Sequence, residues 1–211
     1  FHYTTRFRSM GIFYVYCRTT FSFNRITMRR LFLLFFFLII VLSVNAQKFL
    51  TKNGYISFFS HTPLEDIKGE NNQVAAIIDI STGEMVFQVL IKSFHFDRAL
   101  LEEHFNENYM ESDKFPKSVF KGKITNPASV NFNKNGTYDV TVEGDLTIHN
   151  VTNKVSIKGT VEIVTGGINA SSKFDIVPED YKIEIPGLVR DKISKAMEVT
   201  ISMKYAPIEN K

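Results

Sequence analysis

The stretch His104–Gly122 reads HFNENYMESDKFPKSVFKG and contains three kinds of local pattern. Its start carries the last residues of a helical spacing, its middle carries the Phe115-Pro116 step, and its end alternates as a strand does. We therefore predict the end of a short helix, then a loop, then the start of a strand. A second stretch, Gly144–Val155 (GDLTIHNVTNKV), predicts a hairpin that pairs into the same sheet.

The helix that leads into the first stretch interrupts a chain otherwise rich in strand patterns. Asp97 is its predicted N-cap, and residues 98–106 carry apolar or ring-bearing side chains at helical spacing. These side chains are Leu100, Leu101, His104 and Phe105. A short helix inserted between the strands of a barrel covers one end or flank of it. We therefore expect the first stretch to lie at the mouth of the barrel or to form its lid.

Alternation of apolar and polar residues runs through most of the chain from Gln47 onward. The clearest runs are residues 138–143, 155–163 and 199–205. Each run has one apolar face and one polar face, which is typical of an antiparallel sheet.

Turn residues separate these runs at short intervals. The predicted turns are Ser81–Glu84, Asn133–Gly136, His149-Asn150 and Gly166-Gly167. Short strands joined by tight turns predict a sandwich or a barrel. No internal repeat and no low-complexity linker divides residues 47–211, so we predict that they form one domain.

Residues 1–46 differ in composition from the rest of the chain. Residues 28–46 begin with Met28-Arg29-Arg30, continue with an apolar run and end in a small residue, Ala46. This order is typical of a cleaved secretory signal peptide, so we predict export to the periplasm or out of the cell. The apolar run is shorter than the ~20 residues that a membrane-spanning helix needs. We interpret residues 1–27, which have no acidic residue and no sustained period, as an over-extended, non-native N-terminus.

The formal net charge of +3 for the whole chain does not describe the predicted domain. Six arginines and no acidic residue lie at or before position 30, so residues 47–211 carry 19 basic against 22 acidic residues. A slightly acidic domain argues against nucleic acid as a partner. The single cysteine, Cys17, precedes the predicted cleavage site, so we expect no disulfide in the exported domain.

Two phrases of this sequence resemble the YceI-like family, and the resemblance extends from about Gly54 to Tyr205. In that family a helix containing a His precedes an aromatic residue, a Tyr/Phe-Pro step and a further Phe. The matching residues are His104, Tyr109, Phe115-Pro116 and Val119-Phe120. The second family phrase, G-x-L-T-x-x-G-V-T-K-x-V, is matched by Gly144, Leu146, Thr147, Val151, Thr152 and Val155. The chain departs from it at Asn150, where Gly is usual, and at Asn153, where Lys is usual.

The resemblance implies an all-β fold with one short helix: an antiparallel lipocalin-like β-barrel that encloses an apolar tunnel. It implies an exported binding protein, not an enzyme, that sequesters or transports a polyisoprenoid, an isoprenoid quinone or a similar lipid. We predict that ten residues line the tunnel or its mouth. They are Phe58, Phe87, Val89, Ile91, Leu101, His104, Phe105, Tyr109, Phe115 and Phe120.

Two other functions are open alternatives. An enzyme could use the same cavity for lipid or quinone chemistry, with His104 or nearby carboxylates as acid–base groups. A barrel whose interior is filled by side chains would act through its surface instead, as an envelope stress or interaction protein. The sequence holds no metal-ligand spacing, nucleophile elbow or nucleotide-binding glycine loop, so we predict no catalytic residue, no metal and no cofactor.

Lysines cluster beside the Phe-Pro step, at positions 114, 117, 121 and 123. They could draw the barrel transiently to an anionic membrane surface, or they could protect an exposed strand edge. The resemblance also leaves open a homodimer that pairs through the sheet.

Overall fold

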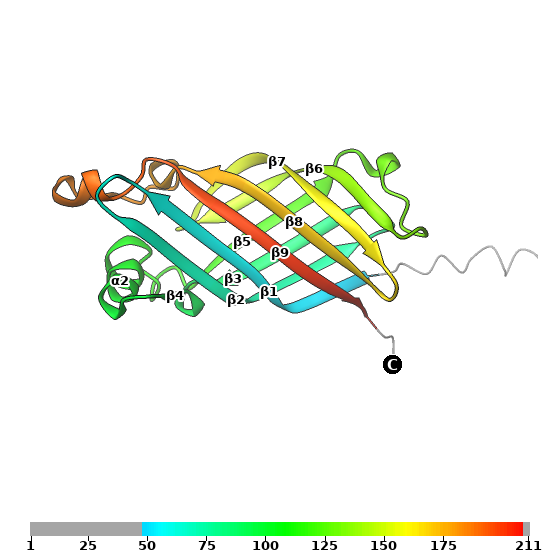
Figure 1. Cartoon of the computed structure of the whole chain (residues 1–211), viewed down its shortest axis with the longest axis horizontal. Helices are drawn as coiled ribbons and strands as arrows, with labels where there is room; N and C mark the ends of the chain where they lie inside the picture. The colour runs from blue at the N-terminus through cyan, green and yellow to red at the C-terminus, as the bar shows by residue number, and fades with distance from the viewer. Residues whose placement is uncertain (1–47, 209–211) are drawn as a thin grey trace, which may run out of the picture. The chain divides into compact units, whose positions relative to one another are not determined.

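Eight antiparallel strands close into a ring within residues 48–208, the residues that the computed structural model describes (Figure 1). The strand order around the ring is β1-β9-β8-β7-β6-β5-β3-β2, and β2 pairs with β1 to close it. The ring strands are β1 (Lys48–His61), β2 (Asp66–Asp79), β3 (Glu84–Leu90), β5 (Lys117–Ile124), β6 (Gly136–Ile148), β7 (Val151–Val164), β8 (Gly167–Ile176) and β9 (Met197–Pro207). A ninth strand, β4 (His95–Phe96), pairs with β2 outside the ring.

One short α-helix and several single helical turns connect the strands. The helix α2 (Ala99–His104) continues directly into a π-helical turn, η2 (Phe105–Tyr109). The 3-10 turns are η1 (Ile91–Ser93), η3 (Pro127–Ser129), η4 (Pro178–Tyr181) and η5 (Gly187–Lys192). The prediction of an antiparallel barrel with one short helix is therefore confirmed.

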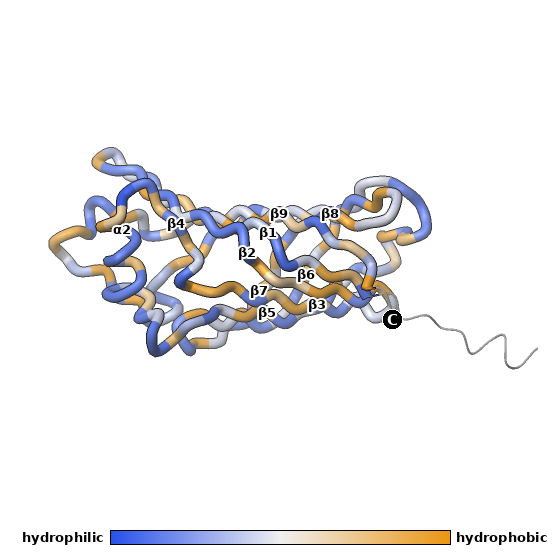
Figure 2. The backbone as a smooth tube through the Cα atoms, turned by 90° about the horizontal axis from the view of Figure 1, so that it is seen from below, coloured by the Kyte–Doolittle hydropathy of each residue, from blue (hydrophilic) through white to orange (hydrophobic). Residues whose placement is uncertain are grey.

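The period-two alternation buries one set of side chains and leaves the other in solvent. Figure 2 shows hydrophobic and hydrophilic residues succeeding one another along the strands. On β9, for example, Val199, Met203 and Tyr205 are buried, whereas Lys204 is exposed. The ring closes within the described residues, and two clusters of buried apolar side chains form its core.

The two ends of the barrel are built differently. At one end lie α2, β4 and the orange segment that contains η4 and η5, and the C-terminal end of β9 lies at the other (Figure 1). Short turns join β2 to β3 and β7 to β8 at the C-terminal end, with positive φ at Gly83 and Gly166. The β6–β7 turn, at the α2 end, uses His149 and Asn150, whose φ values are 49° and 60°. These predicted turns are confirmed.

Some sequence predictions fail or lie outside the described residues. The helix begins later than predicted: its N-cap position is Arg98, and no side chain caps it, so the assignment of Asp97 as N-cap is wrong. The predicted export signal, residues 28–46, and the predicted non-native segment, residues 1–27, lie outside the described part. Between residues 48 and 208, no helix combines the length and the apolar character needed to cross a membrane.

Candidate functional site

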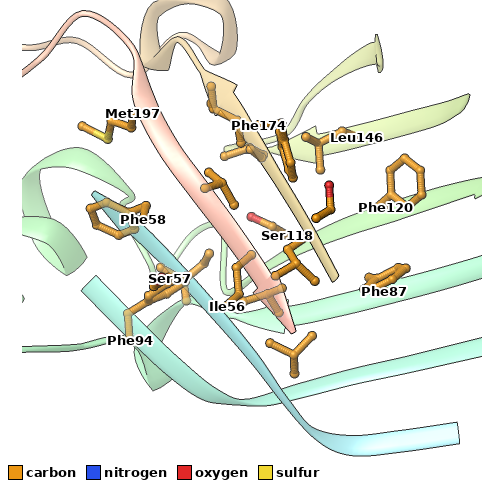
Figure 3. A pocket seen from close by; sticks show the side chains of 18 of the residues that line it. Ile56, Ser57, Phe58, Phe87, Phe94, Ser118, Phe120, Leu146, Phe174 and Met197 are labelled. Carbon is orange, nitrogen blue, oxygen red and sulfur yellow. The ribbon is translucent and has the colours of Figure 1, made fainter. Parts of the chain in front are cut away.

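An apolar cavity of about 450 Å³ occupies the barrel interior and extends to the α2 end. Its volume lies within the range of roughly 300–1,000 Å³ that small-molecule sites occupy. The cavity is surrounded by Ile56, Phe58, Phe87, Phe120, Leu146, Phe174 and Met197, and a hydroxyl such as that of Ser118 is a rare polar group in this view (Figure 3). The interior is therefore hollow toward the α2 end, unlike a barrel filled by side chains.

Small side chains at inward positions of β5, β7 and β8 leave the space for this cavity. Ser118, Gly159, Ala170 and Ser172 line it, where larger side chains would cross the interior. Facing strands contribute larger aliphatic groups, such as Val74 on β2. The inward residues of the alternating strands thus supply an apolar lining, and the small side chains among them leave the cavity unfilled.

The opposite end of the barrel is closed by packed side chains. Ile124 and Ile168 are fully buried there, and Val130, from the β5–β6 connection, is buried over them. Tyr205 is the deepest phenol in the lining, and its burial raises its pKa well above the ordinary value. The cavity is therefore closed at this end and extends toward α2.

A cluster of four phenylalanines holds α2 and η2 on the barrel at the open end. Phe105 stacks on Phe58 with ring centroids 5.4 Å apart, and Phe94 and Phe96 contact the same two rings at 5.0–5.7 Å. Gly69 makes room for this packing, because a Cβ atom at that position would lie 2.5 Å from the Phe58 ring. The helix is therefore attached by aromatic contacts that also line the cavity.

Charged groups collect where the cavity meets solvent. Arg98 and Glu65 form an ion pair across the opening, and both line the cavity with Lys192. The hydrogen bond from Arg98, helped by the charge of Lys192, lowers the pKa of the Glu65 carboxyl. His104 also lines the opening, and its Nδ1 lies 2.9 Å from the Asn108 amide nitrogen. The mouth can thus contact a polar head group while the interior holds an apolar chain.

The barrel wall forks between β7 and β8 near the mouth. These strands pair only from Gly159↔Ser172 to Val164↔Gly167, and beyond that point they separate. The chain between β8 and β9 fills the fork: Tyr181 of η4 is buried, and Asn153 donates a hydrogen bond of 2.8 Å to the backbone carbonyl of Asp180. A second site lies in this fork and shares Leu146, Ile157, Phe174 and Ile176 with the main cavity.

The structure brings nine of the ten sequence-predicted residues to the cavity. These are Phe58, Phe87, Val89, Ile91, Leu101, His104, Phe105, Tyr109 and Phe120. The tenth, Phe115, does not line it, because its ring packs edge-on against His149 with centroids 4.5 Å apart. That any of them contacts a ligand stays a prediction.

Sequence reasoning missed three kinds of lining residue. It did not single out the small inward residues such as Ala170, the cluster partners Phe94 and Phe96, or the charged mouth residues such as Arg98. The first kind could have been found, because Ala170 and Ser172 occupy inward positions of a clear alternation on β8. Within residues 48–208 no group of three or more His, Cys, Asp or Glu side chains is placed to hold a metal ion.

Comparison with known protein families matches residues 48–205 to the YceI-like domain. A comparison with curated proteins gives no significant match.

Comparison with solved structures finds the same fold in distant bacterial proteins. A polyisoprenoid-binding domain from Saccharophagus degradans, implicated in plant cell wall breakdown, superposes with a TM-score of 0.67 at 15% identity, covering 76% of this chain and 98% of that one. BcnA from Burkholderia cenocepacia gives 0.60 at 14% identity, with coverages of 72% and 96%. The YCEI protein of Campylobacter jejuni gives 0.54 at 16% identity, with coverages of 71% and 90%.

Proposed function

The chain belongs to the YceI-like domain family, and from this premise we propose that it is a binding protein that holds a long apolar lipid of the isoprenoid class in its barrel. The observation that carries the proposal is the cavity of about 450 Å³, which is lined almost wholly by apolar side chains and extends to the α2 end. The Saccharophagus domain of similar fold is described as polyisoprenoid-binding, which supports the same class of ligand for this cavity.

The division between interior and mouth favours a ligand with one long apolar part and one polar end. Transfer of each CH₂-sized group from water into such an interior stabilises the complex by about 0.8 kcal/mol. The polar end would lie among Glu65, Arg98, His104 and Lys192, which meet at the opening. Isoprenoid quinones and polyprenyl phosphates both have this division, and the cationic groups favour the phosphate.

We further propose that the protein is exported and carries its ligand outside the cytoplasm. Residues 28–46 support this with the order of a cleaved signal peptide. Expression of the whole chain in a bacterial host tests export. The mass of the exported product should be that of a chain that begins at Gln47. A product confined to the cytoplasm with residues 28–46 intact would contradict export without bearing on ligand binding.

A competition titration tests the binding proposal. A fluorescent polyprenyl probe is bound to residues 48–211, and a quinone, a polyprenyl phosphate and an unbranched fatty alcohol are then added as competitors. The chain has no tryptophan, so the probe supplies the signal. We expect saturable binding of one probe molecule and displacement by the two isoprenoids. Binding that does not saturate, or equal displacement by detergent monomers at the same concentration, would contradict the proposal.

A further inference from the structure

Three leucines at the open end of the barrel are exposed to solvent on three separate segments. Leu64 lies in the β1–β2 turn and is 67% exposed, Leu100 lies on α2 and is 61% exposed, and Leu188 lies on η5 and is 97% exposed. We call these three side chains the leucine rim. Leu188 lies on a protruding turn, and its apolar side chain has no packing partner within the described residues.

The leucine rim surrounds the opening of the cavity. In each segment the next residue in the chain lines the cavity: Glu65 after Leu64, Leu101 after Leu100, and Val189 after Leu188. The β1–β2 turn, α2 and the orange segment all lie at the same end of the barrel (Figure 1). The apolar surface inside the cavity and the exposed leucines outside it therefore meet at one rim.

Cationic side chains flank the most exposed of the three leucines. Residues 187–195 carry Arg190, Lys192 and Lys195 against a single acid, Asp191. Arg190 forms an ion pair with Glu179, and Lys192 lies close enough to Glu65 to lower the pKa of that carboxyl further. The side of the rim at η5 thus presents an apolar tip between cations.

The side of the rim at α2 has the opposite charge. The carboxylates of Glu102 and Glu103 lie directly after Leu101, and Glu102 is 3.6 Å from His95. The net charge of this side is partly offset by His95, which faces Glu102. The rim therefore matches a surface that offers hydrocarbon to all three leucines and head-group phosphates to the η5 cations.

We propose that the leucine rim docks on a lipid bilayer and inserts its three side chains among the acyl chains, with the η5 cations at the head-group phosphates. Single leucines on separate turns, divided by charged residues, do not form the continuous apolar face of a stable protein interface. A fluid bilayer can accept each of them independently. The docking itself does not depend on the proposed function. Only its purpose does: docking would place the cavity opening against the bilayer, where an isoprenoid ligand resides.

Vesicle flotation of residues 48–211 tests the docking directly, because it needs no ligand. The vesicles are of phosphatidylcholine alone, or of phosphatidylcholine mixed with phosphatidylglycerol. We expect the wild-type protein to float with both and severalfold better with the anionic mixture. The triple variant Leu64→Ser, Leu100→Ser, Leu188→Ser should lose at least about tenfold in partition, since each substitution removes an inserting apolar side chain.

A matched control uses exposed apolar residues on the barrel wall. Ile77 and Val86 are 40% and 43% exposed and face each other across β2 and β3, away from the rim. The variant Ile77→Ser, Val86→Ser should float as the wild type does. Equal losses in both variants, or no flotation of the wild type, would overturn the proposal. Sedimentation velocity of the same proteins gives a further test. A dimer that is present in the wild type and lost only in the rim variant would overturn the proposal, because the leucines would then pair two copies of the chain.

Ligand binding separates this inference from the proposed function. The fluorescent polyprenyl probe, delivered from cyclodextrin, should bind the rim variant as well as the wild type, whereas its transfer from vesicles should slow at least about tenfold in the variant. Flotation without any probe binding would contradict the proposed function but not the docking surface. Probe transfer from vesicles at the wild-type rate in the rim variant would contradict the docking surface alone.

Discussion

The carboxylate of Glu111 lies 3.2 Å from Nε2 of His149, which joins two loops 38 residues apart in the sequence. Glu111 follows η2, and His149 lies in the β6–β7 turn. Both residues have left-handed backbone, with φ of 42° and 49°, and Glu111 also pairs with Lys114. This contact fixes the loop between η2 and β5 to the barrel wall, and it explains why Phe115 packs on His149 instead of entering the cavity.

The Glu111 contacts predict a pH-dependent stability difference. The hydrogen bonds from Lys114 and His149 lower the pKa of the Glu111 carboxyl below its ordinary value. A lowered carboxyl pKa stabilises the folded state above the unfolded pKa of about 4.3, and this contribution is lost as the pH falls through the folded pKa. Thermal unfolding should therefore show a lower Tm for Glu111→Gln at pH 7, with the difference shrinking as the pH falls below the unfolded pKa of about 4.3. A Tm difference that does not shrink on acidification would contradict this account.

Filling the cavity should abolish ligand binding. Ala170→Phe places a ring where a small inward residue of β8 lines the cavity, and we expect binding of the polyprenyl probe to weaken at least about tenfold. The neighbouring substitution Asn169→Phe puts the same ring on the outer face of β8 and should leave probe binding unchanged. Comparable probe affinity in the two variants would mean that the ligand does not occupy this cavity.

Removing the central ring of the phenylalanine cluster should loosen α2 from the barrel. Phe105 contacts three other phenylalanines and is partly buried, so Phe105→Ala should cost about 1–3 kcal/mol in the free energy of unfolding. Denaturant titration measures this, and hydrogen exchange should show faster exchange of the α2 amides. Unchanged exchange in α2 despite a lower stability would show that the cluster does not hold the helix.

His104→Ala distinguishes a binding protein from a cavity enzyme. His104 is exposed at the mouth, and its ring lies within hydrogen-bonding distance of the Asn108 amide. Its removal should change probe affinity by no more than about threefold, which is less than 1 kcal/mol. Quinone or polyprenyl phosphate incubated with the wild type should also be recovered chemically unchanged. Conversion of the ligand by the wild type, lost in the variant, would favour the enzyme.

The close pair of glycines between β5 and β6 should tolerate no side chain. Gly144 pairs with Gly122, and a Cβ atom at Gly144 would overlap the backbone carbonyl of Lys121. Gly144→Ala should therefore cost about 2 kcal/mol or more in the free energy of unfolding. Gly187→Ala is the control: it meets no atom within 4 Å and should shift stability by less than about 0.5 kcal/mol. Similar costs at both glycines would argue against a steric cause.

The fold could be predicted because its signal is local and repeated. Alternation on runs such as 138–143 and 199–205 gives both the strand and the face that it buries, and the Asn and Gly residues of the turns set the hairpins. The two quoted stretches then gave the order of elements at the mouth. Residues that face inward on strands, such as Phe87 and Phe120, follow directly from this pattern.

The parts that could not be predicted depend on contacts between distant segments. The aromatic ring of Phe115 and its place near the Phe-Pro step predict that it lines the tunnel, but the Glu111–His149 contact holds its loop against the wall. The fork between β7 and β8 leaves no trace in the alternation, because both strands keep their pattern after their pairing ends. The opening is likewise defined by Glu65, Arg98 and Lys192, which come from three separate segments.

Native mass spectrometry of the protein exported from its own host, followed by organic extraction, tests the central claim most directly. We predict a stoichiometric adduct on the barrel whose extracted mass is that of an isoprenoid lipid, absent from the Ala170→Phe variant. A clean apo mass that persists after incubation with isoprenoid quinones and polyprenyl phosphates would contradict the assignment of this barrel as a carrier of such lipids.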